Sequence, residues 1–318
     1  MNQERVLIIG AAGFVGGHLL KYLSGLDTLD ISAAKLQTEK IDTDGFPAVS
    51  VYDIDILDKT SVDRVIQAVK PGKIIHLAAQ SSVALSWKNP TLTMDINVNG
   101  TFNVLDSVRE FAVDCRVLLV GSSEQYGKIS PDQLPVKETI SLSPENPYAI
   151  SKVTQEMIAN LYIKSYQMDI ILVRAFNHIG PGQSPIFVVA DFARQIAEIE
   201  KGLREPVIKV GNLSAKRDFT DVRDIVRGYW SLLEKGRTGE IYNIGQGQSI
   251  EVGQILKSLI RLSQVAVSVE VDQTKFRPID VPEIVADISK IRMDTDWLPL
   301  VDIQRSLTDT ISYWRSHV

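Results

Sequence analysis

The sequence predicts an α/β protein built on a doubly wound, parallel sheet, with a smaller lobe contributed mainly by its C-terminal part. Short apolar runs, such as RVLIIG at 5–10 and RVLLVGSS at 116–123, alternate with amphipathic stretches through the first half of the chain. Strands that are apolar throughout and alternate with helices are typical of parallel sheets covered by helices on both faces. The stretch GAAGFVG at 10–16 directly follows the first apolar run, as it does in Rossmann-type sheets.

The other elements follow in chain order. We expect a helix from about Phe14, strands at 28–33 and 73–79, a helix near 101–108, a strand at 116–123, a helix over Pro147–Tyr166, a strand at 169–176, a helix within 218–236 and a strand at 239–245 that returns to the main sheet. The alternation loosens after Asn177, where Pro and Gly become frequent. We therefore expect residues 1–176 with 218–246 to form a Rossmann domain, and residues 177–217 with 247–318 to form the smaller lobe.

Composition and charge narrow the class of protein. The chain has 318 residues, a formal net charge of −5 and a pI near 5.5, which argues against a general nucleic-acid-binding or anionic-membrane-binding surface. No apolar run approaches the roughly 20 residues of a membrane span, and the N-terminus leads into the first strand without room for a signal peptide. Cys115 is the single cysteine, so we expect a buried thiol and no intramolecular disulfide. Because we find neither a signal peptide nor a membrane span, we expect a cytoplasmic protein, and we expect no metal site.

The stretch GAAGFVG places Gly10, Gly13 and Gly16 between a strand and a helix, with Phe14 and Val15 among them. Glycines at this turn let the backbone approach a pyrophosphate, which then lies on the positive N-terminus of the helix. The spacing is one residue wider at the front than in the common dinucleotide fingerprint. Its position at the first βα turn nevertheless favours dinucleotide binding over a simple tight turn.

The tip of the second strand should select between NAD(H) and NADP(H). Asp30 lies 20 residues after Gly10, roughly where a ribose-binding acid is expected. With a strand over 28–33, however, Asp30 is mid-strand and Lys35 lies just beyond the end, where it can pair with a 2′-phosphate. We therefore expect NADP(H), with NAD(H) left open and a solvated surface lysine as the alternative.

The stretch YDIDILD at 52–58 is expected to contribute to the adenine site. Asp55 offers a carboxylate to the adenine amino group, and Ile56 offers an apolar wall to its ring. Asp53 and Asp58 are instead expected to end a strand and to cap the following helix.

The stretch HLAAQSS at 76–82 ends a strand with small residues, which let a cofactor lie close. The residues that we assign to the cofactor here are Leu77, Ala78, Ala79 and Gln80. Ser81 and Ser82 should face the cleft at the carboxyl end of the strand. His76 lies inside the apolar run, where a hydrogen-bonded core histidine is a better interpretation than a catalytic one.

The stretch YAISK places Tyr148 and Lys152 one turn apart on one helix face. A phenol with a pKa of about 10 is a poor acid or base at neutral pH. An ammonium nearby favours the phenolate and should lower that pKa, and the same lysine can reach the nicotinamide ribose. Ser122, at the end of the upstream strand, would then hold the substrate oxygen beside Tyr148. Ser123 and Glu124 follow as candidates for additional catalytic roles.

These motifs together make the chain resemble the extended short-chain dehydrogenase/reductases over essentially its whole length: GAAGFVG, DILD, HLAAQSS, NVNGT, GSSEQYG, PYAISK and RAFNHIGPGQ. The resemblance implies a catalytic triad of Ser122, Tyr148 and Lys152, and an asparagine, Asn97, that supports the lysine through water. It also implies a homodimer joined by helices near 100–112 and 148–166.

The runs FNHIGPGQSP, IKVGNLSAKRDFTDVRDIVRGYW and RPIDVP are most similar to the GDP-4-keto-6-deoxy-D-mannose (GDP-6-deoxy-D-mannose) reductases of this family. This similarity implies NADPH-dependent reduction of the 4-keto group of GDP-4-dehydro-6-deoxy-D-mannose to GDP-D-rhamnose. A GDP-sugar carries two phosphate charges, so cationic side chains should converge on it in the smaller, nucleotide-sugar-binding lobe, with Arg217 and Arg277 as the leading candidates. The expected substrate-binding residues are Ser81, Asn177, Lys209, Arg217, Arg277 and Asp280, whereas His178 is expected to pack nearby.

Glu124 keeps a second reaction open. A GDP-mannose 4,6-dehydratase needs a base near C5 of the sugar, and related dehydratases carry a glutamate at this position. They usually carry Thr where Ser122 stands, and an arginine pair that the segment GPGQSPIFVVADF at 180–192 lacks. In a third reaction, 4-epimerisation, the related epimerase–reductase carries a cysteine at the Glu124 position, and Cys115 lies elsewhere. A non-catalytic NADP-binding sensor is the remaining alternative, although such proteins commonly lose the Tyr or Lys retained here.

Overall fold

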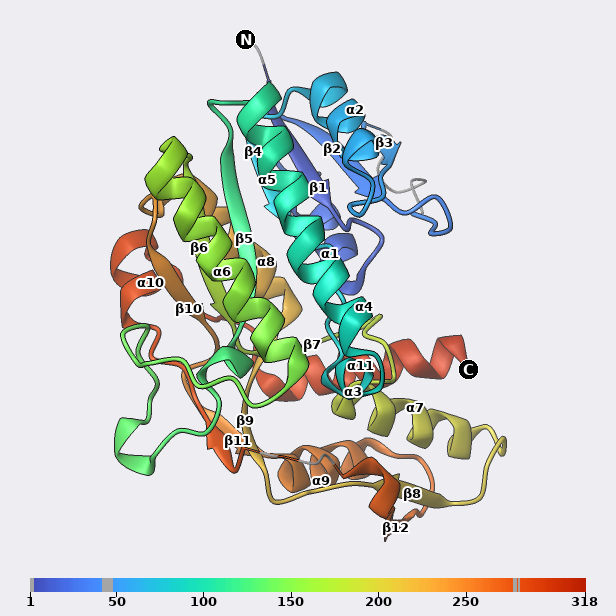
Figure 1. The fold of residues 1–318 in the computed structure, drawn as a ribbon. Coiled ribbons are helices and arrows are strands. Elements are labelled where there is room, and N and C mark those ends of the chain that lie inside the picture. The colour runs from blue at the N-terminus through green and yellow to red at the C-terminus, as the bar shows by residue number, and fades with distance from the viewer. Residues whose placement is uncertain (1–2, 42–47, 277–278, 280) are drawn as a thin grey trace.

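The computed structural model describes residues 3–41, 48–276, 279 and 281–318, and its centre is a seven-stranded parallel sheet (Figure 1). The strands are β1 (Glu4–Ile9), β2 (Leu29–Lys35), β3 (Ser50–Asp53), β4 (Lys73–His76), β5 (Arg116–Ser122), β6 (Ile170–Ala175) and β10 (Ile241–Ile244). Their order across the sheet is β10-β6-β5-β4-β1-β2-β3. The chain changes direction across the sheet between β1 and β4, and the carboxyl ends of strands at such a switch point form the usual ligand crevice.

Helices cover both faces of this sheet, as its continuously apolar strands require. One face packs against α1 (Phe14–Leu23), α8 (Val222–Lys235) and α10 (Ser289–Thr295), and the other against α2 (Lys59–Val69), α5 (Gly100–Phe111) and α6 (Pro147–Tyr166). Successive residues of β1 alternate between the two cores: Val6 and Ile8 face the first, and Leu7 and Ile9 face the second. The sheet is therefore buried on both sides, and its carboxyl edge is left for a site.

Two smaller sheets lie beyond that carboxyl edge (Figure 1). In one, β9 (Lys216–Asp221) lies between β11 (Ser249–Glu251) and β13 (Glu283–Ile284) and also pairs with β7 (Asn177–Ile179); in the other, β8 (Val207–Val210) pairs with β12 (Ser268–Val271). A third core joins α7 (Val188–Glu200), α9 (Val252–Leu262) and α11 (Ile303–His317). The short helical segments are α3 (Val83–Lys88), α4 (Pro90–Met94), a π-helical turn (Asp95–Asn99) and 3-10 turns at Ser123–Tyr126, Pro131–Gln133 and Gln273–Lys275.

The prediction of a doubly wound parallel sheet is confirmed. α6 has the predicted bounds, and β10 returns to the sheet beside β6. β2 ends at Lys35 rather than Ala33, so Asp30 is the second residue of the strand and lies at the edge away from the switch point, not mid-strand.

The segment 218–236 differs from the prediction because its first residues are extended. They belong to β9, and the helix begins only at Val222. β9 also runs across the predicted domain boundary at 217/218, and the division into two domains stays a prediction. Among the described helices, none combines the length and the apolar character needed to span a membrane.

Candidate active site

The turn between β1 and α1 approaches the loop after β4 without intervening side chains. Gly10 has a φ of +90°, and a Cβ there would lie 2.6 Å from the backbone N of Ala78. A Cβ at Gly16 would lie 2.5 Å from the Gly10 carbonyl oxygen. α1 follows Gly13 without a side-chain cap in the described part of the chain, which leaves its first N–H groups to an anion. The cradle fits a dinucleotide pyrophosphate. The first turn of α1 contains Phe14 and Val15.

Lys35 ends β2 at the same edge of the sheet. Its Nζ lies 2.6 Å from Oδ1 of Asp53, the last residue of β3. The lysine therefore shares its charge with a carboxylate, and its contact with a 2′-phosphate stays a prediction. Nearby, the exposed Asp55 accepts a hydrogen bond from the N–H of Leu57 at 2.9 Å, and Ile56 is buried.

The loop after β4 turns away from the sheet at the switch point. The N–H groups of Leu77 and Ala78 both donate to the carbonyl of Ile9 in β1, at 2.9 and 3.0 Å. Ala78 and Ala79 are half-buried beside the glycine turn. Their small side chains leave room for a cofactor over the ends of β1 and β4.

Asn97, in the π-helical turn before α5, connects this loop to α6. Its Oδ1 accepts from the N–H of Gln80 at 2.8 Å, and its Nδ2 donates to the Gln80 carbonyl at 3.0 Å and to Ser151 Oγ at 2.9 Å. Ser151 Oγ donates to the carbonyl of Tyr148. Asn97 therefore braces the turn of α6 that carries Tyr148, and its support of Lys152 through water stays a prediction.

Ser122 and Tyr148 meet where β5 ends and α6 begins, and the hydroxyl of Ser122 lies close enough to the phenol of Tyr148 to lower its pKa. Ser122 Oγ also accepts from the N–H of Glu124 at 3.2 Å, which holds the hydroxyl at the end of β5. Asn146 fixes the start of α6, because its Oδ1 accepts from the N–H of Ala149 at 2.8 Å. A hydroxyl and a phenol are thereby held side by side at the carboxyl edge of the sheet.

Lys152 lies one turn further along α6 and is only 4% exposed. Its Nζ donates to the carbonyl of Val120 at 2.8 Å and to Oε1 of Gln155 at 2.9 Å, and it lies 6.0 Å from the centre of the Tyr148 ring. These two bonds use two of the three N–H groups of the ammonium, so a third can serve a ligand.

The pKa values of the pair differ from the sequence prediction. Burial raises the pKa of Tyr148 to about 12; the hydrogen bond with Ser122 lowers it, and the charge of Glu124 raises it. Burial lowers the pKa of Lys152 to about 7. The prediction that Lys152 brings the Tyr148 pKa toward neutrality is therefore wrong for the protein alone, because desolvation disfavours both charged forms. At neutral pH Tyr148 is a protonated phenol.

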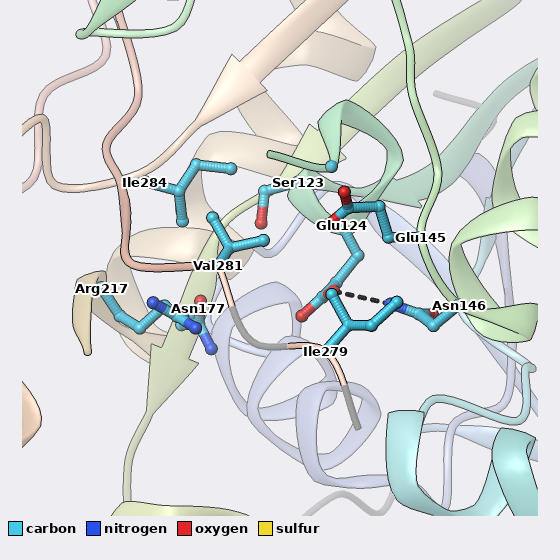
Figure 2. Close-up of a pocket in the computed structure, with 10 residues that line it drawn as sticks. Ser123, Glu124, Glu145, Asn146, Asn177, Arg217, Ile279, Val281 and Ile284 are labelled. Carbon is cyan, nitrogen blue, oxygen red and sulfur yellow. Dashed lines mark hydrogen bonds between the residues drawn. The ribbon is translucent and has the colours of Figure 1, made fainter. Parts of the chain in front are cut away.

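A pocket opens at the 3-10 turn that follows Ser122 and at the start of α6, without Ser122 or Tyr148 in its lining (Figure 2). Its lining residues are Ser123, Glu124, Gly127, Glu145, Asn146, Asn177, Arg217, Ile279, Val281 and Ile284. Asn146 Nδ2 donates to Oε2 of Glu124 at 2.9 Å, which holds this carboxylate at the wall (Figure 2). Asn177 and the buried Arg217 lie together on the opposite side, on the paired strands β7 and β9. The pocket is thus lined by two carboxylates, two amides and one guanidinium, a polar set of side chains.

Other predicted substrate residues are not brought into this lining. Lys209 is exposed on β8, in the separate two-stranded sheet. Ser81 is exposed just before α3. Arg277 and Asp280 lie outside the described residues, and their roles stay predictions.

Two residues outside the pocket also test the sequence interpretation. His76 is buried as predicted, but neither ring nitrogen has a hydrogen-bond partner among the described residues, and burial lowers its pKa to about 3. The prediction of a hydrogen-bonded core histidine is in that respect wrong. Cys115 is buried, and burial raises the pKa of its thiol, as expected of an inert cysteine.

Sequence reasoning missed Asn146 and Gln125. Asn146 precedes a proline at the first position of α6, and an Asn–Pro pair before an apolar run is a recognisable helix start. Gln125 follows Ser122 with the S-x-x-Q spacing of a capping box, which predicts its bond to the Ser122 N–H. Its bond to Glu156 of α6 has no local signal, because that partner lies far along the chain.

A family model described as GDP-mannose 4,6 dehydratase matches residues 7–310. The chain belongs to this family. It is an NAD(P)-dependent oxidoreductase of the extended short-chain dehydrogenase/reductase type, as the motifs predicted.

Members of the family share the fold and differ in their reactions. GDP-6-deoxy-D-mannose reductase of Pseudomonas aeruginosa is 31% identical, over 99% of this chain and 98% of that protein. GDP-mannose 4,6-dehydratase of Vibrio cholerae is 27% identical, over 97% of this chain and 93% of that protein. The solved structure of RMD from Pseudomonas aeruginosa complexed with NADPH is 30% identical and matches with a TM-score of 0.87, over 99% of this chain and 100% of that one.

Proposed function

We propose that the enzyme reduces the 4-keto group of GDP-4-dehydro-6-deoxy-D-mannose with NADPH and yields GDP-D-rhamnose. The observation that carries this proposal is the protonated Tyr148, whose phenol lies near the hydroxyl of Ser122, next to the residues Ser123 and Asn146 of a polar pocket. A reductase needs an acid for the oxygen that becomes a hydroxyl, and a tyrosine with a pKa of about 12 is in its acid form at neutral pH. The full-length similarity to a GDP-6-deoxy-D-mannose reductase supports the choice of sugar.

The residues of the cradle suit NADPH. The glycine turn at 10–16 and the start of α1 would hold the pyrophosphate, Asp55 and Ile56 the adenine, and Lys35 the 2′-phosphate. Leu77, Ala78, Ala79 and Gln80 would border the nicotinamide half. When bound, the nicotinamide supplies the hydride for the reduction.

Side chains of the enzyme would supply the proton of the reduction and stabilise the oxygen that receives it. Tyr148 donates its phenolic proton to the oxygen on C4 of the sugar as that oxygen gains negative charge. Ser122 donates a hydrogen bond to the same oxygen, so two groups stabilise the developing alkoxide. Lys152, held by Val120 and Gln155, offers its remaining N–H to the nicotinamide ribose.

The smaller lobe would bind the nucleotide sugar. Arg217 and Asn177 are suited to a diphosphate, because a guanidinium can donate two parallel hydrogen bonds and an amide can donate a third. Arg277, Asp280, Ser81 and Lys209 remain candidates for the nucleotide. We keep the division into residues 1–176 with 218–246 and residues 177–217 with 247–318 as part of this proposal.

The test is an incubation of the purified enzyme with GDP-4-keto-6-deoxymannose and NADPH, followed by absorbance and product analysis. We expect one NADPH consumed for each GDP-D-rhamnose formed, and slower turnover with NADH. The Tyr148→Phe variant should lose about 10²-fold or more in kcat, since it removes the acid. Wild-type enzyme that leaves NADPH and the keto sugar unchanged would contradict the proposal.

Glu124 favours one alternative, a GDP-mannose 4,6-dehydratase. Its carboxylate lines the pocket beside Ser123 and is held by Asn146, as a base for C5 of the sugar would need to be. The similarity to GDP-mannose 4,6-dehydratases supports this reaction as well. Conversion of GDP-mannose to the keto sugar without net consumption of cofactor would favour the dehydratase.

We also propose a homodimer built on α5 and α6. These neighbouring helices lie on the outside of the sheet (Figure 1) and expose Phe102, Phe111, Ile150, Met157, Leu161 and Tyr166. An apolar patch on a helix pair suits a self-complementary interface. Leu161→Arg should give a monomer by sedimentation, and Leu300→Arg, at an exposed leucine elsewhere, should not. Wild-type enzyme that sediments as a monomer would contradict the proposal.

A further inference from the structure

A buried glutamine joins the strand of the serine to the helix of the tyrosine. Gln125 lies in the 3-10 turn after β5 and is fully buried. Its Oε1 accepts from the backbone N–H of Ser122 at 2.8 Å, and its Nε2 donates to Oε2 of Glu156 at 2.9 Å. One side chain therefore spans from the end of β5 to the middle of α6.

Glu156 lies on the active face of α6. It follows Tyr148 by eight residues and Lys152 by four, so the three side chains lie along one side of the helix. The two hydrogen bonds of the Gln125 amide thus fix the position of Ser122 along α6, relative to Tyr148 and Lys152, the other two members of the predicted triad.

Arg174 of β6 fixes the carboxylate of Glu156. Its Nη2 and Nε donate to the two oxygens of Glu156 at 2.7 and 2.9 Å, and its Nη1 donates to the hydroxyl of Tyr126 and to the carbonyl of Glu138, both at 3.0 Å. An ionised carboxylate accepts hydrogen bonds only, so it requires the NH₂ group of Gln125. The carbonyl of that amide must then face the N–H of Ser122.

Gly121 leaves the space that this arrangement needs. A Cβ at Gly121 would collide with Oε1 of Gln125 and would lie 2.8 Å from the carbonyl oxygen of Val173. The glycine before the two serines therefore has a packing reason of its own, independent of any ligand.

We propose that Gln125 is a positioning residue, which sets the distance between Ser122 and Tyr148 through Glu156 and Arg174. The inference rests on the proposed function, because that function requires both hydroxyl groups at one substrate oxygen. Gln125 has no hydrogen bond to the hydroxyl of Ser122 or to the phenol of Tyr148. It acts through the backbone N–H of Ser122. Its loss should therefore lower kcat and leave the KM for the sugar nearly unchanged.

The test is Gln125→Glu, which keeps the shape and the oxygen that faces Ser122 but removes the donor to Glu156. At pH 8 two carboxylates would then face each other, and we expect kcat to fall about tenfold or more, with KM changed by less than about threefold. At pH 6 the introduced carboxyl can carry a proton and donate it to Glu156, so the ratio of variant to wild-type kcat should rise toward one.

A second variant tests the pairing. In Gln125→Glu with Glu156→Gln, the donor and acceptor change places, and the amide on α6 can donate to the carboxylate in the 3-10 turn. We expect kcat at pH 8 to exceed that of Gln125→Glu by about threefold or more. If kcat of Gln125→Glu equals that of wild type at pH 8, or if its loss is independent of pH and is not relieved by the second change, the proposal is wrong.

Gln195 in α7 provides a matched control. Its Nε2 donates to a carboxylate, Oδ2 of Asp191, at 2.9 Å, and its Oε1 accepts a backbone N–H, that of Lys209, at 2.9 Å. Its Nε2 also donates to the carbonyl of Lys209 at 3.0 Å, so Gln195→Glu likewise replaces an amide donor by a carboxylate that faces a carboxylate, on a helix other than α6. We expect it to lower the melting temperature as Gln125→Glu does, with no pH-dependent loss of kcat. If wild-type enzyme converts GDP-mannose and leaves NADPH unused, the proposed function fails, and the same comparisons run on that conversion still decide the role of Gln125.

Discussion

Burial raises the pKa of Tyr148 and lowers the pKa of Lys152, and both shifts are compatible with the proposed reduction. The pKa of about 12 keeps Tyr148 protonated at neutral and moderately alkaline pH, so the phenol can supply the proton that the proposed reduction needs. The pKa of about 7 puts Lys152 close to losing its charge at neutral pH. The pH dependence of the enzyme should therefore report the lysine, not the tyrosine.

We expect kcat/KM to fall as the pH rises through about 7, because the free enzyme then loses the ammonium of Lys152. Lys152→Arg should lower kcat/KM at pH 6 but remove the descending limb, since a guanidinium stays charged to pH above about 12. Initial rates between about pH 6 and 10 check this. A limb that persists unchanged in Lys152→Arg would assign it to another group.

At the scale of elements, the βα turn is defined by backbone contact. Gly10→Ala should weaken NADPH binding by about tenfold or more, because the new Cβ would press on the N of Ala78 and the conformation with φ of +90° disfavours any side chain. Gly202→Ala is the control: its φ is +69°, and nothing lies within 4 Å of its Cβ. Calorimetric titration with NADPH measures the affinity of both variants. Equal losses of affinity would show that the contact between residue 10 and Ala78 is not what determines NADPH binding.

The elements could be predicted wherever the signal was local. The apolar run before the glycines, the Asn–Pro start of α6 and the tyrosine and lysine on one helix face are all patterns within one segment. The link from Gln125 to Glu156 joins residues 31 positions apart, and its strength depends on Arg174 from a third element. The shift in the Tyr148 pKa depends on burial, which is a property of the assembled site and not of the YAISK spacing.

At the scale of the whole molecule, Asp218 connects the central sheet to the smaller one. Its Oδ1 accepts from the N–H of Gln246 at 2.6 Å, and its Oδ2 accepts from the N–H groups of Gly247 and Ala286 at 2.9 and 3.1 Å. The first two donors follow β10, and the third follows β13. One buried carboxylate therefore joins the segments after β10 and β13 to its own strand β9, next to Arg217, so that three segments meet there.

We expect Asp218→Asn to lower the free energy of unfolding by about 2–4 kcal/mol, because the amide would set an NH₂ group against N–H donors in a buried site. Asp302→Asn, at the exposed cap of α11, should change it by less than about 0.5 kcal/mol, since Asn caps a helix as well as Asp does. Urea unfolding measures both. Equal, small effects would show that the three segments do not depend on Asp218.

Lys152 also donates a hydrogen bond to a backbone carbonyl of the central sheet. Val120 faces β4, but β4 has already ended, and the N–H of Ala78 that would have continued the ladder donates instead to the carbonyl of Ile9. The Lys152 ammonium takes the carbonyl of Val120 that is left over. The turn of the chain after β4 therefore leaves the carbonyl of Val120 without a backbone donor. The donor that replaces it is Lys152, the residue that we propose as a contact of the nicotinamide ribose. Without a bound ligand the Lys152 ammonium still donates to the carbonyl of Val120, whereas a variant that has no donor at position 152 leaves this carbonyl of β5 without that hydrogen bond.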